Sequence, residues 1–407
     1  MKFSFLFVVL SCLTLLYSCD GCNNNNPPKK GGGRNDSTKI EEPPVFEEKV
    51  EPCSVLVYVD NSSSMSGYAE GENKPFVDAI SDMMSLIPNK GKASYWAVKN
   101  SGIEDIAIDL ARHNFNDTET PFPSIFASLA RQSQDDDVLT FFVTDGIIGV
   151  SNANYLKQSL GAIKNQIRDS LLNYPGISLV CFRLLSGYNN KNKYYYTNTN
   201  KQVQLKNVSS RPFYVIAVGK KSHTRWMLDK MKTESSLEKY QNSDFLAFGT
   251  HDLHEKMLFR DSKNFERNKK DGTLRLRKGK KDFCLQGDIP ECVLSDVDAD
   301  YVLQHLSLGM NGKIDSILKP SIVNNTLKLN CSDTRTIYSP QNKVKVTLKK
   351  DIPQKWNNWS SEDDSNIEND MMEQTKTFAL SYLLQGIYEG TGDDKFLLID
   401  GTIEFSK

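Results

Sequence analysis

The chain has 407 residues, of which 39 % are hydrophobic and 25 % are charged, and its formal net charge is −1. This composition is ordinary for a folded soluble protein, and the length is sufficient for two or three domains. A net charge so close to zero excludes a global field that would attract nucleic acid or an acidic membrane, so no nucleic-acid partner is expected.

Residues 1–18 have the pattern of a secretory signal peptide. One Lys is followed by an uncharged apolar stretch that is too short for a comfortable transmembrane helix. The stretch ends in Leu16-Tyr17-Ser18-Cys19, which resembles the bacterial lipobox. The resemblance implies that Cys19 is acylated, with palmitate or a similar fatty acid, and becomes the mature N-terminus. Ordinary cleavage without a lipid is the alternative.

Residues 19–52 are rich in Asn, Pro, Gly and charged residues and contain almost nothing that could form a core. Such a segment is predicted to be a disordered tether. A lipidated Cys followed by a tether resembles an outer-membrane lipoprotein of a Gram-negative bacterium, facing either the periplasm or the cell surface.

Apolar runs alternate with helical patterns over residues 53–255. The run at 54–60 is uninterrupted, which is typical of a strand that is covered on both faces. Further strands are predicted at 92–98, 104–111, 137–146, 177–185 and 211–219, and helices at 74–88, 124–133, 154–174 and 224–235. The alternation predicts the α/β class, with an open, mostly parallel sheet and helices on both faces.

Three segments depart from this alternation. Residues 186–210 contain three consecutive Tyr and predict an inserted β-hairpin, either a solvent-exposed hairpin or a recognition loop. Residues 256–283 are basic and predict a charged linker or an exposed hairpin. Residues 284–407 contain short strand patterns, one helix over 370–390 and an acidic loop over 357–370, and predict a smaller β-rich or α+β domain.

The cysteines beyond the signal peptide and the anchor would lie in an oxidising compartment if the chain is exported. Cys284 and Cys292 are close in sequence and could form a disulfide bond, whereas Cys181 lies in an apolar strand pattern and is predicted to be a buried thiol.

Polar side chains follow two of the predicted buried strands. Asp60, Ser62 and Ser64 stand at alternate positions after the strand at 54–60, and Asp145 follows the strand at 137–146. Ligands of open α/β sheets bind at the carboxyl ends of the strands, and hydroxyl and carboxylate oxygens are hard ligands that suit Mg²⁺, Mn²⁺ or Ca²⁺. The alternative is that Asp60 and Ser62 cap the next helix, but capping needs only one such residue.

The Asp-x-Ser-x-Ser pattern at 60–64, together with Val143-Thr144-Asp145-Gly146, resembles the von Willebrand factor A domain. In that family the motif is a metal-ion-dependent adhesion site. The resemblance implies metal ligands Asp60, Ser62, Ser64, Asp145 and a Thr from the loop before the second helix, with Thr120 as the first choice and Thr118 as the second. Ser63 stands where the family usually has Gly, and the Thr loop is rich in Pro.

This resemblance implies a binding protein rather than an enzyme. The expected function is that of a lipid-anchored cell-envelope protein that recognises a partner protein, through a carboxylate of the partner, at a divalent cation. A metal-dependent phosphoester or sulfate-ester hydrolase with a Ser nucleophile is one alternative, although the further Asp and His ligands of such enzymes are missing from the pattern. The other alternative is a degenerate scaffold that binds without metal.

Overall fold

The computed structural model describes residues 50–69, 75–87, 94–99, 102–105, 113, 115–135, 137–150, 153–189, 195–196, 202–205, 208, 210–249, 259–267, 274–277, 282–289, 299–310, 313–314, 318–331, 343–395 and 397–406. The predicted signal peptide, Cys19 and nearly all of the predicted tether lie outside these residues, as does Cys292. Among the described residues, no helix has the length and apolar character needed to cross a membrane.

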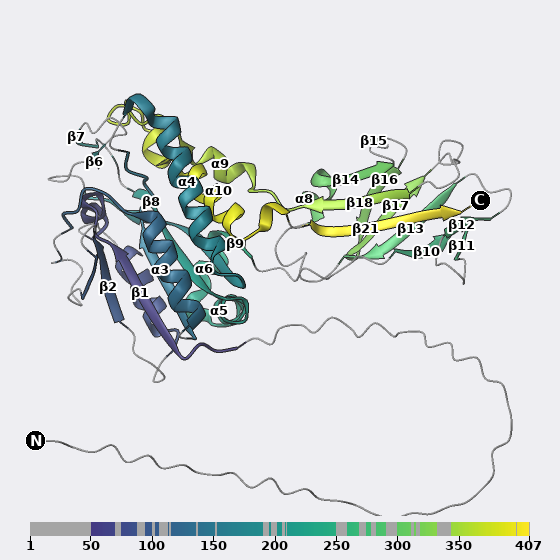
Figure 1. Cartoon of the computed structure of the whole chain (residues 1–407), viewed down its shortest axis with the longest axis horizontal. Helices are drawn as coiled ribbons and strands as arrows, with labels where there is room; N and C mark the ends of the chain where they lie inside the picture. The colour runs from purple at the N-terminus through teal and green to yellow at the C-terminus, as the bar shows by residue number, and fades with distance from the viewer. Residues whose placement is uncertain are drawn as a thin grey trace, which may run out of the picture. The chain divides into compact units, whose positions relative to one another are not determined.

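The first part of the chain builds a seven-stranded sheet, which we call the main sheet (Figure 1). Its strands in sequence order are β1 (Ser54–Asp60), β2 (Ser94–Lys99), β3 (Gly102–Asp105), β4 (Val138–Thr144), β5 (Ile177–Gly187), β8 (Ser210–Lys220) and β9 (Asp244–Phe248). Their spatial order is β3-β2-β1-β4-β8-β5-β9. The long apolar runs of the sequence therefore form the central strands, as expected for strands that are covered on both faces.

The main sheet is mixed, and the prediction of a mostly parallel sheet was wrong. Only the pairs β1–β2 and β1–β4 are parallel, whereas β2–β3, β4–β8, β5–β8 and β5–β9 are antiparallel. The physical reason lies in the connection between β5 and β8. The described residues between these strands contain no crossover helix, and β8 pairs antiparallel with β5 over its whole length.

Helices cover both faces of the main sheet, as predicted. They are α1 (Ser66–Ala69), α2 (Pro75–Ser85), α3 (Phe122–Asp135), α4 (Leu156–Leu172), α5 (Lys221–Thr233) and α6 (Glu238–Gln241), with short 3₁₀ turns η1 (Ser63–Met65), η3 (Ala153–Tyr155) and η4 (Ser235–Leu237). Successive strand residues enter opposite layers, since Val57 and Val59 belong to the cluster under α2 and α5, while Tyr58 belongs to the cluster under α3 and α4.

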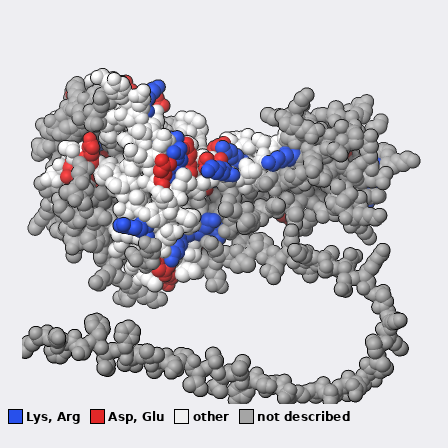
Figure 2. Space-filling view, viewed as in Figure 1, with Lys and Arg blue, Asp and Glu red and all other residues white. Residues whose placement is uncertain are grey.

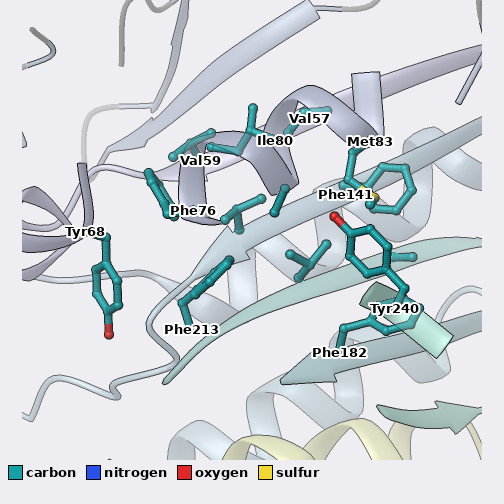
Figure 3. Packing of buried hydrophobic residues seen from close by; sticks show 14 of the residues in the cluster. Val57, Val59, Tyr68, Phe76, Ile80, Met83, Phe141, Phe182, Phe213 and Tyr240 are labelled. Atoms are coloured by element: carbon teal, nitrogen blue, oxygen red, sulfur yellow. The ribbon is translucent and has the colours of Figure 1, made fainter. Parts of the chain in front are cut away.

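The layer under α2 is an aromatic-rich core (Figure 3). Phe76 of α2 meets Phe213 of β8 edge to face, with ring centroids 5.6 Å apart. Ile80 and Met83, one and two turns further along α2, are also fully buried. Their spacing is the helical pattern seen in the sequence, so the prediction of this helix and of its buried face is confirmed.

A second set of strands follows the main sheet. It comprises β10 (Phe259–Lys263), β11 (Phe265–Arg267), β12 (Leu274–Leu276), β13 (Phe283–Asp288), β14 (Leu306–Met310), β15 (Lys313–Ile314), β16 (Leu318–Val323), β17 (Thr326–Cys331), β18 (Lys343–Lys349) and β21 (Leu397–Ser406), with helix α8 (Ala299–His305). They form one four-stranded and one six-stranded sheet, which together we call the β module. The basic segment predicted as a linker or hairpin contains the antiparallel pair β11–β12.

Residues 350–395 do not belong to the β module, contrary to the predicted single domain over 284–407. This return segment contains α9 (Gln354–Asn358), β19 (Ser360–Ser361), η6 (Glu373–Thr375), β20 (Thr377–Phe378), α10 (Leu380–Gly390) and η7 (Asp393–Lys395). Leu383, Leu384 and Ile387 of α10 are buried in the same cluster as α3 and α4. Figure 1 shows α4 and α10 alongside each other. The predicted helix over 370–390 begins only at Leu380, after Ala379 with a φ of 60°.

The contact between α4 and α10 depends on glycine. A Cβ built on Gly386 would lie 2.9 Å from the backbone oxygen of Lys164 and 3.1 Å from the Cβ of Ile167. Replacing Gly386 by alanine is therefore expected to push the helices apart and to lower the free energy of unfolding by about 1–3 kcal/mol in urea titrations. Gly161 of α4 has open space around its Cα. Gly161→Ala is the matched control and should be neutral or stabilising by up to about 1 kcal/mol.

Candidate functional site

Asp60 is the centre of a polar cluster at the carboxyl end of β1. Only 1 % of its surface is exposed, yet three groups donate hydrogen bonds to its carboxylate. The backbone N–H of Ser62 reaches Oδ1 at 2.9 Å, the Thr120 hydroxyl reaches Oδ1 and Oδ2 at 2.9 and 3.0 Å, and the Thr144 hydroxyl reaches Oδ2 at 2.6 Å. A buried carboxylate with this many donors is held in one orientation.

The two serines of the motif lie next to Asp60. The Ser62 and Ser64 hydroxyl oxygens are 3.1 Å apart, so both face the same small volume. Ser64 belongs to the 3₁₀ turn η1, in which the Ser62 carbonyl accepts a hydrogen bond from the Met65 N–H. Ser62 stands at the N-cap of this turn without a side-chain capping hydrogen bond, whereas the Asp60 carboxylate accepts a hydrogen bond from the Ser62 N–H. Local capping thus accounts for one bond of Asp60 but not for the paired hydroxyls of Ser62 and Ser64.

Asp145 is the second buried carboxylate, with 2 % of its surface exposed. It follows β4, which is the parallel neighbour of β1, so the two carboxylates arise at the same edge of the sheet. Its Oδ1 accepts a hydrogen bond from the Ile147 N–H at 3.1 Å, but its Oδ2 is buried without any hydrogen-bond partner. A buried oxygen without a partner is costly, and a further ligand at this point would satisfy it.

The electrostatics of the two carboxylates are coupled. Burial raises the pKa of Asp60, and the hydroxyl of Thr144, the N–H of Ser62 and the hydroxyl of Thr120 lower it in part. Burial raises the pKa of Asp145 to about 7, and the nearby charge of Asp60 adds to the shift, whereas the Ser64 hydroxyl opposes it. The two buried carboxylates do not readily carry a negative charge at the same time. A nearby cation would lower both pKa values and so favour the doubly ionised form.

Thr120 is brought to the site by hydrogen bonds between two loops. Ser62 and Asp117 form a β-bridge, in which the Ser63 N–H donates to the Asp117 carbonyl at 2.9 Å and the Asp117 N–H donates to the Asn61 carbonyl at 3.1 Å. The fully buried Asn61 side chain donates to the Asp117 carboxylate, and its Oδ1 lies 2.7 Å from His113 Nε2. Thr118 is exposed, so Thr120 is the threonine that the loop brings to Asp60.

The structure thus brings together all five residues that the sequence singled out as metal ligands, namely Asp60, Ser62, Ser64, Thr120 and Asp145. Four residues that act on the cluster, Thr144, Asn61, His113 and the buried Arg211 whose charge acts on Asp145, were not predicted from the sequence. Thr144 directly precedes Asp145, and Asn61 lies inside the motif. Their positions in the sequence are therefore a signal from which both could have been predicted. His113 carries no local signal, because its role depends on the fold of the loop.

The donor set suits a hard divalent cation. Two carboxylates and three hydroxyls offer only oxygen ligands, which Mg²⁺, Mn²⁺ and Ca²⁺ prefer. Within the described ranges, no three side chains of His, Cys, Asp or Glu gather closely enough to hold a metal. Any metal at this edge would therefore depend on the Ser and Thr oxygens.

The free cysteines of the described ranges, Cys53, Cys181 and Cys284, form no contact with this cluster that the structure records. Cys181 is fully buried in the layer under α3 and α4, and burial raises the pKa of its thiol, which confirms the prediction of a buried thiol. Because Cys292 lies outside the described residues, its predicted bond with Cys284 remains a prediction.

Comparison of the chain with protein-family models, with curated proteins and with solved structures gave no match, so the candidate site rests on its own geometry.

Proposed function

We propose that the protein is a binding protein of the cell envelope that recognises a partner protein through a divalent cation held at the Asp60 cluster. The observation that carries the proposal is the pair of buried carboxylates with surrounding hydroxyls, in which Oδ2 of Asp145 has no hydrogen-bond partner. The likeness of the motif to the von Willebrand factor A domain supports the same function. The lipid anchor at Cys19 is part of the proposal and rests on the sequence alone.

The roles of the residues follow from their positions. Asp60 and Asp145 supply the negative charge, and Ser62, Ser64 and Thr120 supply neutral oxygens. Thr144 donates to Asp60 and so holds the carboxylate in place. A divalent cation held by these residues would attract an oxygen of the partner, and a carboxylate is a ligand that such hard cations prefer.

Calorimetric titration with Mn²⁺ tests the proposal. The wild-type protein is expected to bind the metal, and Asp60→Ala is expected to abolish binding, because it removes the carboxylate on which the hydroxyls converge. Thr120→Val is expected to weaken binding by at least about tenfold, as is typical when a group that supports a metal site is lost.

Thr118→Val is the matched control, because Thr118 lies two residues away and is exposed. Its affinity for Mn²⁺ should equal that of the wild type. Circular dichroism of each variant separates a lost site from a lost fold. Absence of Mn²⁺ binding to the folded wild-type protein, or equal binding by the folded Asp60→Ala variant, would overturn the proposal in favour of a scaffold that works without metal.

A further inference from the structure

The return segment borders the candidate cation site. Its Thr377 hydroxyl lies 2.9 Å from the Tyr214 hydroxyl of β8. A Cβ built on Gly146, the residue after the second buried carboxylate, would lie 2.9 Å from the Tyr214 ring and 3.5 Å from Cγ2 of Thr377. The segment therefore reaches the edge of the main sheet at which β1 and β4 end, which we call the site edge. The predicted hairpin borders this edge too, since its strands β6 (Tyr195–Tyr196) and β7 (Gln202–Val203) pair antiparallel and β6 contacts η1.

Large apolar side chains are exposed around the site edge. In the part of the chain that the structure describes, four of them have 54–70 % of their surface exposed, namely Met371, Met372, Tyr155 and Leu185. The remaining exposed ones in that part are less than half exposed, namely Val50, Leu172 and Val323. The two methionines precede Thr377 in the return segment and so lie close to the site edge.

Leu185 lies at the site edge because β5 ends there. Strand β8 pairs antiparallel with both β4 and β5, so β4 and β5 run in the same direction and end at the same edge. Leu185 and Arg183 point to the same face of β5, since they are two residues apart. The Arg183 guanidinium donates to the Thr375 carbonyl at 3.3 Å, so this face of the strand meets the return segment.

Tyr155 lies at the site edge because α4 begins there. It directly precedes α4, which follows β4 in the chain. The helices α4 and α10 run in the same direction, since a Cβ on Gly386 would contact Lys164 and one on Gly390 would contact Leu171, further along α4. Both helices therefore begin at the site edge, and the methionines that precede α10 lie on the same side of the molecule as Tyr155.

The loop that carries the two methionines is held by hydrogen bonds. The Asp370 carboxylate accepts hydrogen bonds from the N–H groups of Met372 at 2.9 Å and Glu373 at 3.2 Å. The buried Gln374 side chain donates to the Ile367 carbonyl at 2.9 Å, and Ile367 is itself buried in the core under α2. The methionines are thus presented to solvent by an anchored turn.

The surroundings of the methionines are acidic. Residues 361–376 contain six acidic residues and one basic residue, Lys376, which pairs with Glu373 at 2.6 Å. Glu362 is exposed in this loop, whereas an exposed base, Lys157, lies near Tyr155. The whole chain is close to neutral, and Figure 2 shows both signs of charge over the described part of one face. The excess of acid is therefore particular to the return segment.

We propose that Met371, Met372, Tyr155 and Leu185 form an apolar docking surface at the site edge. Its occupant is a partner protein that presents apolar side chains bordered by Lys or Arg, beside the carboxylate that takes the cation. This inference rests on the proposed function and adds the chemistry of the partner to it. Exposed apolar side chains that gather at one place mark protein contacts, and methionine adapts to the shape of a partner. Basic side chains fit the acidic loop because complementary charges select the partner.

Panning a phage-displayed library of random short peptides on the full chain in Mn²⁺, with elution by chelator, tests this chemistry. The enriched peptides are expected to combine one Asp or Glu with large apolar residues and with Lys or Arg. Enriched peptides that lack apolar residues, or that are acidic throughout, would overturn the inference. So would a panning that enriches no peptide on a chain that binds Mn²⁺.

Fluorescence anisotropy of the most enriched peptide then tests the surface itself. The variant that combines Met371→Ser and Met372→Ser should bind the peptide at least about tenfold more weakly, as expected when apolar anchors of an interface are lost. The matched control combines Leu172→Ser at the far end of α4 and Val323→Ser in the β module, which removes the same number of exposed apolar side chains. The control should bind like the wild type, and equal loss in both variants would refute the docking surface.

The acidic loop is tested by a single charge reversal. Glu362→Lys should weaken binding of the peptide by about two- to fivefold, the range of an exposed charge pair, whereas Asp300→Lys at an exposed position of α8 should leave it unchanged. Higher ionic strength should weaken binding by the wild type more than by Glu362→Lys. A Glu362→Lys chain that binds as tightly as the wild type contradicts a basic border on the partner.

Calorimetry with Mn²⁺ alone separates these outcomes from a failure of the proposed function. The methionine variant should bind Mn²⁺ like the wild type, because its substitutions lie outside the Asp60 cluster. Analytical ultracentrifugation identifies the other possible occupant, a second copy of the chain. A wild-type dimer that the methionine variant does not form would assign the surface to that copy and overturn the proposal of a separate partner.

Discussion

Replacing Trp356 by alanine is expected to lower the free energy of unfolding by about 3–5 kcal/mol, the range typical of a large aromatic side chain removed from a core. Trp356 lies in α9 of the return segment and is fully buried. Its ring packs against Tyr214 of β8, with centroids 6.4 Å apart, and against Trp359 at 5.2 Å. If the return segment is part of the core of the main sheet, truncating Trp356 must destabilise the whole unit.

Urea unfolding followed by circular dichroism measures the effect. Met372→Ala is the control, because Met372 belongs to the same segment but has 70 % of its surface exposed, and its loss should change the stability by less than about 0.5 kcal/mol. A Trp356→Ala protein as stable as the wild type would contradict the inclusion of Trp356 in the core of the main sheet.

The second large effect concerns Asp145, whose replacement by asparagine should stabilise the metal-free protein at pH 8 and abolish metal binding. The pKa of Asp145 is about 7 in the folded protein, against 3.8 for an ordinary Asp. Between about pH 4 and pH 7, Asp145 of the folded protein therefore keeps a proton that the unfolded chain has released. The stability that comes from this proton is fully present below about pH 4 and is lost as the pH rises through about 7.

Without metal, the wild type is thus expected to lose stability between pH 5 and pH 8. Asp145→Asn should show a smaller loss, because Asp60, whose pKa burial also raises, is then the one acid of the pair that still titrates. At pH 8 the variant should be more stable by roughly 1–3 kcal/mol, because it buries no second negative charge beside Asp60. Saturating Mn²⁺ should reverse the order, since the metal stabilises only the form that binds it.

Asp169→Asn serves as the control for this prediction. Asp169 is exposed on α4 and pairs with Arg168, so its replacement should leave the pH profile unchanged. A wild-type stability that rises from pH 5 to pH 8 without metal, or an Asp145→Asn variant with the same profile as the wild type, would contradict a carboxyl that stays protonated near neutral pH.

The strands that carry the site could be predicted from sequence because their signals are local. The runs at 54–60 and 137–146 are uninterrupted and apolar, and their polar ends mark one edge of the sheet. Thr120 was the weaker prediction, since its position depends on Asn61 and Asp117, which hold two loops together across more than fifty residues.

The direction of β8 could not be predicted in the same way. A buried strand has the same apolar pattern whether it runs parallel or antiparallel to its neighbours, so residues 211–219 carry no sign of direction. The useful signal was the absence of any helical period between β5 and β8, because a parallel connection needs a crossover. The packing of α10 against α4 could not be predicted either, because an apolar helix face does not identify the helix that it contacts.

The return segment makes the unit around the main sheet discontinuous in the chain. Most of the β module follows β9 in the sequence. The chain then returns to the unit through residues 350–395, whose helix α10 packs on α4, and ends with β21 of the β module. Because a chain is synthesised from its N-terminus, the layer under α3 and α4 stays open until Leu384 and Ile387 have been made. The last tenth of the chain thus completes a core that the first half begins. A premature stop anywhere before it would expose the apolar surface of α3 and α4 to aggregation.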